Sequence, residues 1–423
     1  MSSNPASPVT RITPPSDSKI YLDLTGLPWS HSFLLTILKS CNSNLDTFDI
    51  STTTIQGVNV VPGTDRPQST SHSAVMEIVH KNDNKTTTST IYLKKIAAID
   101  IDKPYPDLRR NICYARNELT FYKTCQTACN TPRLLHSVLN TKAIGDHDVS
   151  DPPGPAPADL TGVGGILVLE PVNLDPSDSS SYFQKSPLTI PEVKLALKTF
   201  AKLHASHWNS PNLTSLNLQR HGGSYALPNR NPTELKKVSS NFKKFCSEFS
   251  PLNPSFYTSS ILSVGRRLEE SASFISSSLL SPSPFKTLIH GDSKSLNTFL
   301  SSSHPSLLID FASAGPGHGM SDVSMTLVHA LKPGYEEENL IDYYIEVLKG
   351  EGVEYSKDQA MEHFNLGLCD YARFMLGRFW GSSTPATFEG KKDNENVALV
   401  NRDIECAEQF IKRVEEALTS LNL

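Results

Sequence analysis

The spacing of apolar residues differs between the two halves of the chain. In the first half, short runs rich in β-branched and apolar residues predict strands, at residues 52–61, 73–80, 89–97, 131–139 and 164–172. Two stretches with apolar residues at helical spacing predict helices, at 30–48 and 108–125. The first half is therefore predicted to be β-rich.

The second half follows a helical period. Residues 189–208 predict a strong helix that has Pro191 near its start, and helical patterns continue to about residue 280. Residues 286–312 predict a hairpin of short strands, and everything beyond Asp322 predicts helices again. The chain is thus predicted to be α+β, with a β-rich N-terminal part and a mostly helical C-terminal part.

Composition fits a globular protein and excludes several classes. Of the 423 residues, 38% are hydrophobic and 20% are charged, and the net charge is −5. Without a basic run, a nucleic-acid groove is not expected. The longest apolar runs are too short to cross a bilayer, and the Ser/Pro-rich residues 1–18 predict a disordered lead without a signal peptide. We expect a cytoplasmic monomer or homodimer whose seven scattered cysteines are free thiols.

The candidate chemistry lies in "LIHGDSKSLNTFL" and "LLIDFASAGPGHG". These two segments place Asp292, Asn297 and Asp310 at the ends of short apolar runs. A carboxylate and a carboxamide that converge are hard oxygen ligands of the kind Mg²⁺ requires. A second carboxylate that stays off the metal accepts the proton of an attacking hydroxyl, as in a kinase active site. The alternative is that these are ordinary turn residues.

The same motifs resemble a known group. "HGDSKSLN", "LLIDFASAGPGHGMSD" and "LKTFAKLHASHW" look like the small-molecule kinases of the protein-kinase-like superfamily, namely the aminoglycoside phosphotransferase, choline kinase and ecdysteroid-kinase-like families. The resemblance implies a bilobal protein-kinase-like fold that uses ATP and Mg²⁺ to phosphorylate a hydroxyl of a small metabolite. It implies an ATP-binding lobe at 19–173 and a catalytic and substrate lobe at 174–423. Within the first lobe, the Pro-, Gly- and Asp-rich composition near 145–165 predicts a flexible surface insertion.

The resemblance assigns roles to residues of the second lobe. Asp292 would be the catalytic base, and Asn297 and Asp310 would hold the metal. Lys294 would steady the γ-phosphate, although it also fits a solvated loop lysine. Asp322 resembles the aspartate that bonds the backbone amides of the catalytic loop, with a plain helix N-cap as the alternative.

Further resemblances assign the residues that would bind ATP to the first lobe. In "IYLKKIA", Lys94 would reach the phosphates, while Lys95 points to the opposite face, so one of the two is expected to face solvent. Glu118, in "RNELTFY", would pair with that lysine. Backbone groups around Glu170 and Val172 would meet the adenine. The loop "PGTDRPQSTSH" offers only Gly63 for a phosphate loop, whereas "AGPGHG" reads as a tight connection.

The acceptor is the least determined part. Helix "LCDYARFMLGRFW" combines one acid, Asp370, with arginines and aromatic residues, which favours a neutral, partly apolar alcohol such as a sterol. The alternative is that this helix makes a buried helix–helix contact. His204 and Trp208, four residues apart, favour core packing over a ligand role. Two other functions remain open: a catalytically silent nucleotide-binding scaffold, and a protein kinase.

Overall fold

The computed structural model describes residues 11–13, 18–42, 51–67, 71–82, 85–145, 147–175, 177–178 and 180–423. Most of the predicted N-terminal lead, residues 1–10 and 14–17, lies outside them. The chain divides into two compact units. Unit 1 comprises Met1–Gln126 and Pro132–Val172, and unit 2 comprises Thr127–Thr131 and Asn173–Leu423.

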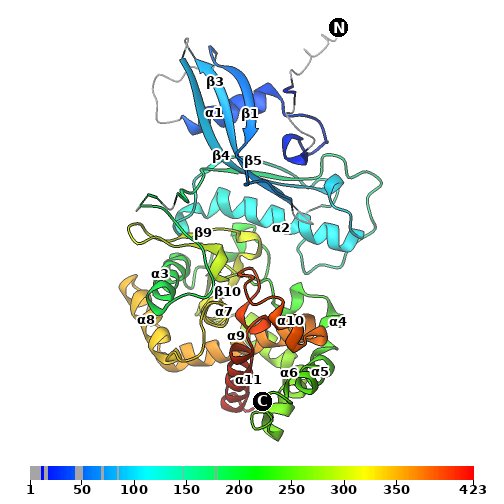
Figure 1. Cartoon of the computed structure of the whole chain (residues 1–423), viewed down its shortest axis with the longest axis vertical. Helices are drawn as coiled ribbons and strands as arrows, with labels where there is room; N and C mark the ends of the chain where they lie inside the picture. The colour runs from blue at the N-terminus through cyan, green and yellow to red at the C-terminus, as the bar shows by residue number, and fades with distance from the viewer. Residues whose placement is uncertain are drawn as a thin grey trace. The chain divides into compact units, whose positions relative to one another are not determined.

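An antiparallel sheet forms the centre of unit 1 (Figure 1). Its strands are β1 (Thr54–Val60), β2 (Arg66–Pro67), β3 (His72–Asn82), β4 (Lys85–Ala97), β5 (Leu134–Asn140) and β6 (Gly164–Leu169). The order is β1-β3-β4-β6-β5, with the short β2 beside β3. All five predicted strands are confirmed, and β2 is the one that the sequence pattern did not indicate.

The two faces of this sheet are covered by different helices. On one face, Ile91 and Leu93 pack in a core with Ile37 of α1 (His31–Cys41). On the other face, Ile96 packs with Ile112 of α2 (Tyr105–Thr124). Because side chains alternate along a strand, neighbours on β4 serve different faces. This alternation separates the two consecutive lysines of β4.

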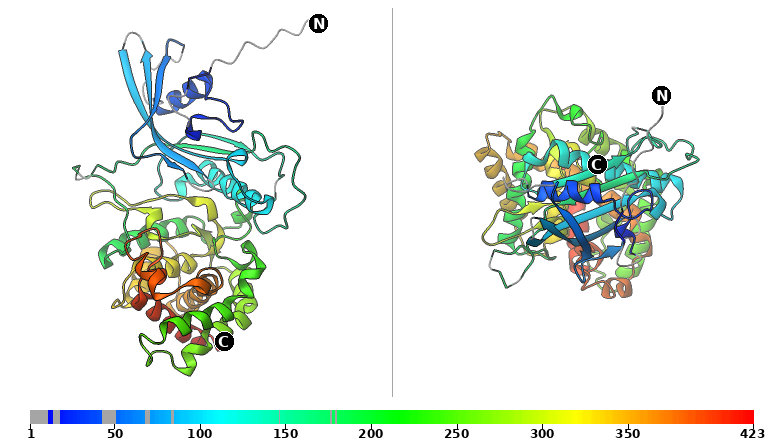
Figure 2. Two further views of the ribbon diagram at one scale, coloured as in Figure 1. Left: turned by 45° about the vertical axis from the view of Figure 1, so that its right-hand side comes forward. Right: turned by 90° about the horizontal axis from the view of Figure 1, so that it is seen from above.

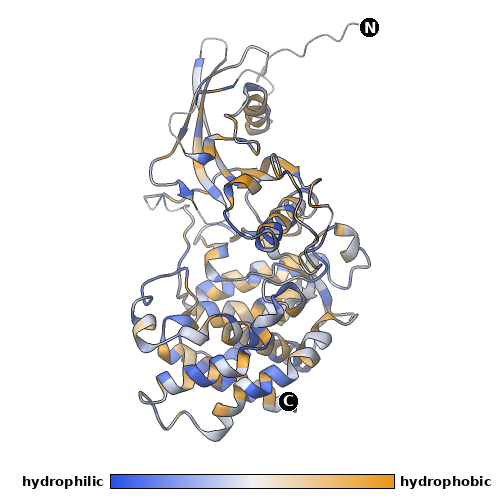
Figure 3. Ribbon diagram, turned by 90° about the vertical axis from the view of Figure 1, so that its right-hand side faces the viewer, coloured by the Kyte–Doolittle hydropathy of each residue, from blue (hydrophilic) through white to orange (hydrophobic). Residues whose placement is uncertain are grey.

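Unit 2 is mostly helical, which confirms the predicted fold class (Figure 2, green to red). Its helices are α3 (Ile190–Ser206), α4 (Pro232–Leu235), α5 (Val238–Phe249), α6 (Ser259–Leu280), α7 (Gly319–Ala330), α8 (Glu337–Gly350), α9 (Lys357–Arg378), α10 (Pro385–Glu389) and α11 (Ile404–Ser420). Every residue of α7 is buried, as are most of α9, so these two helices form the centre. Many of the surrounding helices show apolar and polar sides in Figure 3.

Four short strands carry the motif region. They are β7 (Lys286–Ile289), β8 (Thr298–Phe299), β9 (Leu307–Leu308) and β10 (Gly315–His318). The predicted hairpin is confirmed for β8 and β9, which pair with each other. However, β7 pairs with β10, in the segment that was expected to be only a tight connection. Glycine suits this strand, since a Cβ on Gly315 would lie 2.8 Å from the Gln219 carbonyl oxygen.

Within the described part of the chain, no helix combines the length and the apolar character that crossing a membrane requires.

Candidate active site

Asp322 holds the backbone of the loop that follows β7. Its carboxylate accepts hydrogen bonds from the amides of His290 (2.7 Å) and Gly291 (2.9 Å). Gly291 has φ +78°, and a Cβ there would lie 2.2 Å from the Ser313 carbonyl oxygen. Asp322 is buried in the first turn of α7, whose N-cap is His318. The amide-bonding role is therefore confirmed, and the N-cap alternative is wrong.

A buried histidine contacts the carboxylate of Asp322. Nε2 of His204, on α3, lies 3.1 Å from the Asp322 carboxylate, and its Nδ1 lies 2.7 Å from the Tyr344 hydroxyl. His204 is fully buried, as expected for a core residue, and Trp208 packs edge-on against Tyr355. Burial raises the pKa of Tyr344 well above its usual value, so its hydroxyl stays protonated. This buried network connects the loop that follows β7 to α3 through His204 and to α8 through Tyr344.

Three of the predicted residues converge on the loop itself. Nδ2 of Asn297 donates to the backbone oxygen of Asp292 (2.7 Å) and to its carboxylate (3.1 Å). Nζ of Lys294 lies 3.1 Å from the same carboxylate. Asn297 is buried, whereas the side chains of Asp292 and Lys294 are 22% and 32% exposed. The acid is therefore held in a fixed position and is still accessible to a reactant.

The second motif is tied to the first through Ile309. Its amide donates to the Asn297 carbonyl (3.0 Å), and its carbonyl accepts from Nε2–H of His290 (2.8 Å). Asp310 follows immediately, in the left-handed conformation with φ +65°. This is a sparsely populated region that Asp and Asn tolerate better than most residues. The 3₁₀ turn Phe311–Ser313 begins right after it. The predicted acid, amide and second acid thus belong to one connected piece of structure.

The donor set fits a magnesium ion. Because Nδ2 of Asn297 is engaged twice by Asp292, Oδ1 is left without a partner among the described residues. In that part of the chain, no three His, Cys, Asp or Glu side chains gather into a metal-binding group. Mg²⁺ is characteristically held by one or two protein oxygens together with waters and substrate phosphates. One amide oxygen and one carboxylate match that requirement.

Unit 1 contains the predicted lysine–glutamate pair. Nζ of Lys94 lies 2.8 Å from the Glu118 carboxylate, which is buried on α2. The expectation that one of the two β4 lysines faces solvent is wrong, because the side chains of Lys94 and Lys95 are only 17% and 0% exposed. Lys95 donates to the carbonyls of Lys19 and Leu22 and pairs with Asp100 at 2.9 Å. Burial lowers its pKa, against the opposing effect of Asp100. The segment that contains Lys19 and Leu22 therefore covers the face of the sheet on which Lys95 lies.

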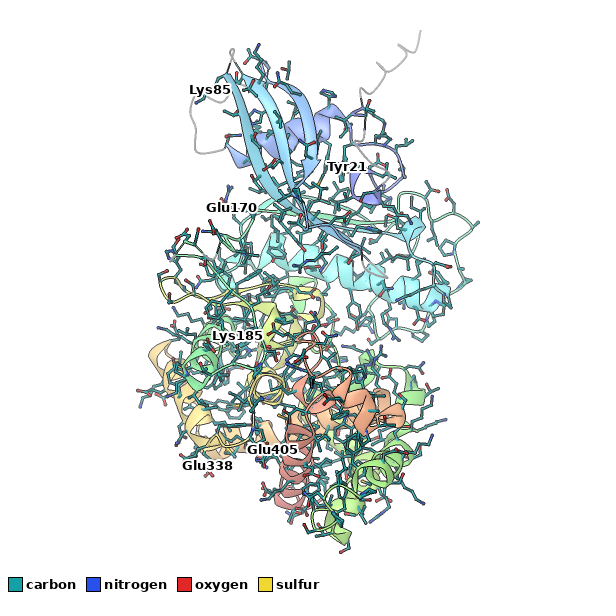
Figure 4. The ribbon with its side chains drawn as sticks, in the orientation of Figure 1. Tyr21, Lys85, Glu170, Lys185, Glu338 and Glu405 are labelled. Carbon is teal, nitrogen blue, oxygen red and sulfur yellow. The ribbon has the colours of Figure 1, made fainter. Side chains whose placement is uncertain are left out.

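The remaining residues predicted to bind the nucleotide lie at the edges of unit 1. Glu170, labelled in Figure 4, follows β6 and uses its amide to bond the Arg133 carbonyl (2.9 Å). The Val172 amide has no hydrogen-bond partner among the described residues. Gly63 has φ +78° in the turn after β1, and a Cβ there would meet nothing within 4 Å. Residues 68–70 of the predicted phosphate loop lie outside the described residues.

The helix that was expected to line the acceptor pocket is largely core. Asp370 pairs with Arg373 over 2.7 Å, and both are buried. Burial raises the pKa of Asp370, and Arg373 opposes that shift. Tyr371 and Trp380 are also buried. The burial of these residues and the pairing of the acid with its arginine fit the alternative, a buried helix–helix contact.

Sequence reasoning missed a cavity of about 820 Å³ in unit 2. Arg402, at its wall, donates to the backbone and hydroxyl oxygens of Ser186 (3.0 and 2.9 Å). The Ser186 hydroxyl in turn lies 3.4 Å from the His329 carbonyl, and Nδ1 of His329 lies 3.4 Å from the Ser295 hydroxyl. Burial lowers the pKa of His329 to about 4, and the charges of Lys294, Asp292 and Arg402 also act on it. The cavity wall is therefore linked to the loop that carries Asp292 through Ser186 and His329.

Comparisons with known proteins give structural neighbours only. No protein-family model matches the sequence, and no curated protein matches it. Among solved structures, the choline kinase LicA from Streptococcus pneumoniae aligns with 12% identity and a TM-score of 0.38, over 92% of this chain and 99% of that one.

Two further neighbours are complexes. The aminoglycoside phosphotransferase APH(4)-Ia, as a thermostable mutant with ADP and hygromycin B, aligns with 9% identity and a TM-score of 0.39, over 87% of this chain and 95% of that one. Spectinomycin phosphotransferase with ADP and spectinomycin aligns with 12% identity and a TM-score of 0.39, over 87% and 94% of the two chains. All three structures align over most of the chain, at low sequence identity and with TM-scores below 0.5.

Proposed function

We propose that the protein is an ATP-dependent phosphotransferase that moves the γ-phosphate to a hydroxyl of a small metabolite. One observation carries the proposal: hydrogen bonds through Ile309 join the segment of Asp292 and Asn297 to the segment of Asp310. This connection supports an accessible acid and two metal-binding oxygens in a single rigid site. Such a combination is what phosphoryl transfer to an alcohol requires.

In the proposed reaction, Asp292 takes the proton of the acceptor hydroxyl. The acceptor oxygen then forms a bond to the γ-phosphorus, while the bond between that phosphorus and the β–γ bridging oxygen breaks and ADP leaves. Asn297 keeps the Asp292 carboxylate oriented through its Nδ2 group. Oδ1 of Asn297 and the carboxylate of Asp310 would hold Mg²⁺, which when bound neutralises phosphate charge.

Other residues would hold the phosphates and the adenine. Lys94, oriented by Glu118, would contact the α- and β-phosphates, and Lys294 would contact the γ-phosphate. The adenine would meet the carbonyl of Glu170 and the amide of Val172, because these groups have no hydrogen-bond partner among the described residues.

The acceptor would occupy the cavity lined by Arg402, which Ser186 and His329 link to the loop of Asp292. Its volume of about 820 Å³ lies in the range of small-molecule sites, roughly 300–1,000 Å³. Five carboxylates and three cationic side chains line it: Glu389, Asp393, Glu395, Asp403, Glu405, Lys332, Lys392 and Arg402. Glu405, labelled in Figure 4, lies in the first turn of α11. The charged lining favours a polar acceptor, and the carboxylate excess favours one with an amine over a sterol-like alcohol.

The test is acceptor-dependent ADP formation by the purified protein with Mg-ATP. The acceptors are choline, spectinomycin, hygromycin B and a hydroxysterol, and the matched control is Asp292→Asn. We expect an acceptor to gain one phosphate by mass spectrometry, with none formed by the control. Nucleotide binding without any transfer would favour the silent scaffold. Transfer to protein substrates alone would favour a protein kinase, and absence of nucleotide binding would refute both this proposal and those alternatives.

A further inference from the structure

The ion pair between Lys94 and Glu118 depends on how α2 lies against the sheet of unit 1. Gly165 on β6 allows a close approach, since a Cβ there would lie 3.2 Å from Cδ1 of Leu119. That contact sets the distance between helix and sheet next to Glu118. Rotation of α2 about its own axis would turn the Glu118 side chain away from Lys94. This rotation is limited by the packing of Ile112 against Ile96 of the sheet and by the segment that covers the N-terminal half of the helix.

The connection between β5 and β6, residues 141–163, packs on the N-terminal half of α2. One apolar cluster joins Ile144 and Val163 of this segment to Leu108 and Ile112 of α2, with Leu160 packed against it. In Figure 1 the connection runs next to α2 within unit 1. Its composition favours a flexible surface segment, and most of residues 152–161 are exposed, yet Ile144, Leu160 and Val163 share a core with the helix.

A buried arginine holds the two together. Arg109 of α2 is 2% exposed, and its guanidinium donates to the carbonyls of Asp151 (3.0 Å) and Asp148 (2.9 Å). Among the described residues, no carboxylate forms an ion pair with it. A buried charge is costly unless it is hydrogen-bonded, so these two carbonyls are its main compensation. Separating α2 from the segment would remove these hydrogen bonds from a buried charge, so the contact between them is strongly favoured.

The segment is built to present those carbonyls rigidly. The Asp151 carboxylate accepts from the Asp148 amide (2.8 Å), and the Asp151 amide donates to the Asp148 carbonyl (3.1 Å). The Asp148 carboxylate accepts from the Ser150 amide (3.0 Å). Prolines follow the turn, at 152, 153, 155 and 157. Because proline fixes φ, the backbone of this stretch has few alternative conformations.

We propose that residues 141–163 are an internal brace for α2, and that Arg109 is a positioning residue. By fixing the N-terminal half of α2, the brace keeps Glu118 paired with Lys94 and so sets the affinity for the nucleotide. The effect on ATP rests on the proposed function, whereas the effect on α2 does not. Because the brace is part of unit 1 itself, it holds α2 in this position at all times.

The first experiment compares Arg109→Met with Arg110→Met, since Arg110 is the next residue on α2 and has no hydrogen bond among the described residues. Hydrogen exchange is measured for α2 amides around Glu118, and ATP affinity is measured in parallel. For Arg109→Met we expect exchange about tenfold faster and ATP binding about tenfold weaker, on the scale of losing buried charge-assisted bonds. Arg110→Met should match wild type, and Arg109→Lys should fall between.

The second experiment tests whether Arg109 acts through Glu118. In a Glu118→Gln background, Arg109→Met should cause no further loss of ATP affinity, because the pair is already broken. Additive losses, or wild-type α2 exchange in Arg109→Met, would overturn the proposal. If Arg109→Met does not fold, replacing the four prolines with serine loosens the brace and should give the same faster exchange. If wild type binds no ATP, the proposed function fails, and the α2 exchange still decides on the brace.

Discussion

Nδ2 of Asn297 donates to both the backbone oxygen and the carboxylate of Asp292, over 2.7 and 3.1 Å. This double contact orients both residues at once. The carboxylate is held in the partly exposed position that a base needs, and the amide oxygen of Asn297 is left for a cation. The contact also means that a change at either residue affects the other.

Replacing the proposed base should remove turnover and leave binding intact. Asp292→Asn keeps the shape of the side chain but cannot accept the hydroxyl proton. We expect kcat to fall by on the order of 10²–10⁴, with the KM for ATP little changed. Steady-state kinetics measure this, with Asp358→Asn, an exposed residue at the start of α9, as the control. Near wild-type turnover in Asp292→Asn would exclude this role.

Asp310 should be needed for magnesium-dependent nucleotide binding. Asp310→Ala removes the carboxylate, and Asp310→Asn does so while tolerating the left-handed backbone at φ +65°. Both variants should lose the Mg-ATP-induced rise in melting temperature, because no other carboxylate of that segment replaces it. The asparagine variant separates loss of the ligand from backbone strain. An unchanged thermal shift in both would indicate that the metal binds elsewhere.

The two lysines of β4 should differ in their effect on ATP binding. Lys94→Met should raise the KM for ATP at least about tenfold, because Lys94 is proposed to bind phosphate. It should also lower stability, because the buried carboxylate of Glu118 loses this cation. Lys95→Met leaves Asp100 without its buried partner, so we expect the free energy of unfolding to fall by about 3 kcal/mol. Denaturant unfolding and ATP kinetics on both variants decide this. The reverse pattern would mean that Lys95 is the phosphate-binding lysine.

Loss of the Asp322 acceptor should loosen the loop. In Asp322→Asn, one oxygen that serves the amides of His290 and Gly291 is replaced by a donor. We expect the free energy of unfolding to fall by about 2 kcal/mol, with lower kcat, since a buried charge-assisted network is broken. Denaturant titration and kinetics measure both quantities. Wild-type values for both would show that other contacts hold the loop.

Acid should destabilise the protein through His318. Burial lowers its pKa to about 3, with further lowering by His363 and Lys286, and both ring nitrogens lack a partner among the described residues. The unfolded chain takes up this proton near pH 6.5, whereas the folded protein does so only near pH 3. The stability that His318 contributes is therefore full above pH 6.5 and is lost as the pH falls towards 3.

The corresponding variant is His318→Leu. Between pH 6.5 and 4.5, the free energy of unfolding should fall by about 2–3 kcal/mol less in His318→Leu than in wild type. Denaturant titrations at the two pH values measure this. The exposed His304 provides the control as His304→Gln, which should keep the wild-type pH dependence. If His318→Leu also keeps the wild-type dependence, other groups control acid unfolding.

Local patterns in the sequence were sufficient for much of the fold and for the candidate chemistry. Alternating and helical periods marked five strands of unit 1 and most helices of unit 2, because these elements bury one face each. The spacing of Asp292, Asn297 and Asp310 indicated a shared site, because a short hairpin leaves little freedom in where its ends lie. These are short-range constraints that neighbouring residues impose on one another.

Tertiary structure alone decided which polar residues are buried and what they contact. Sequence alternation separated Lys94 from Lys95, but only the chain at Lys19 and Leu22 determined that Lys95 is enclosed. The Asp–Arg pair on α9 looked like a pocket lining until its burial was known. The bonds from Arg109 to Asp148 and Asp151 likewise join residues about 40 positions apart. A sequence pattern reports which face of an element is apolar, whereas the partner of a buried charge depends on which distant segment packs against it.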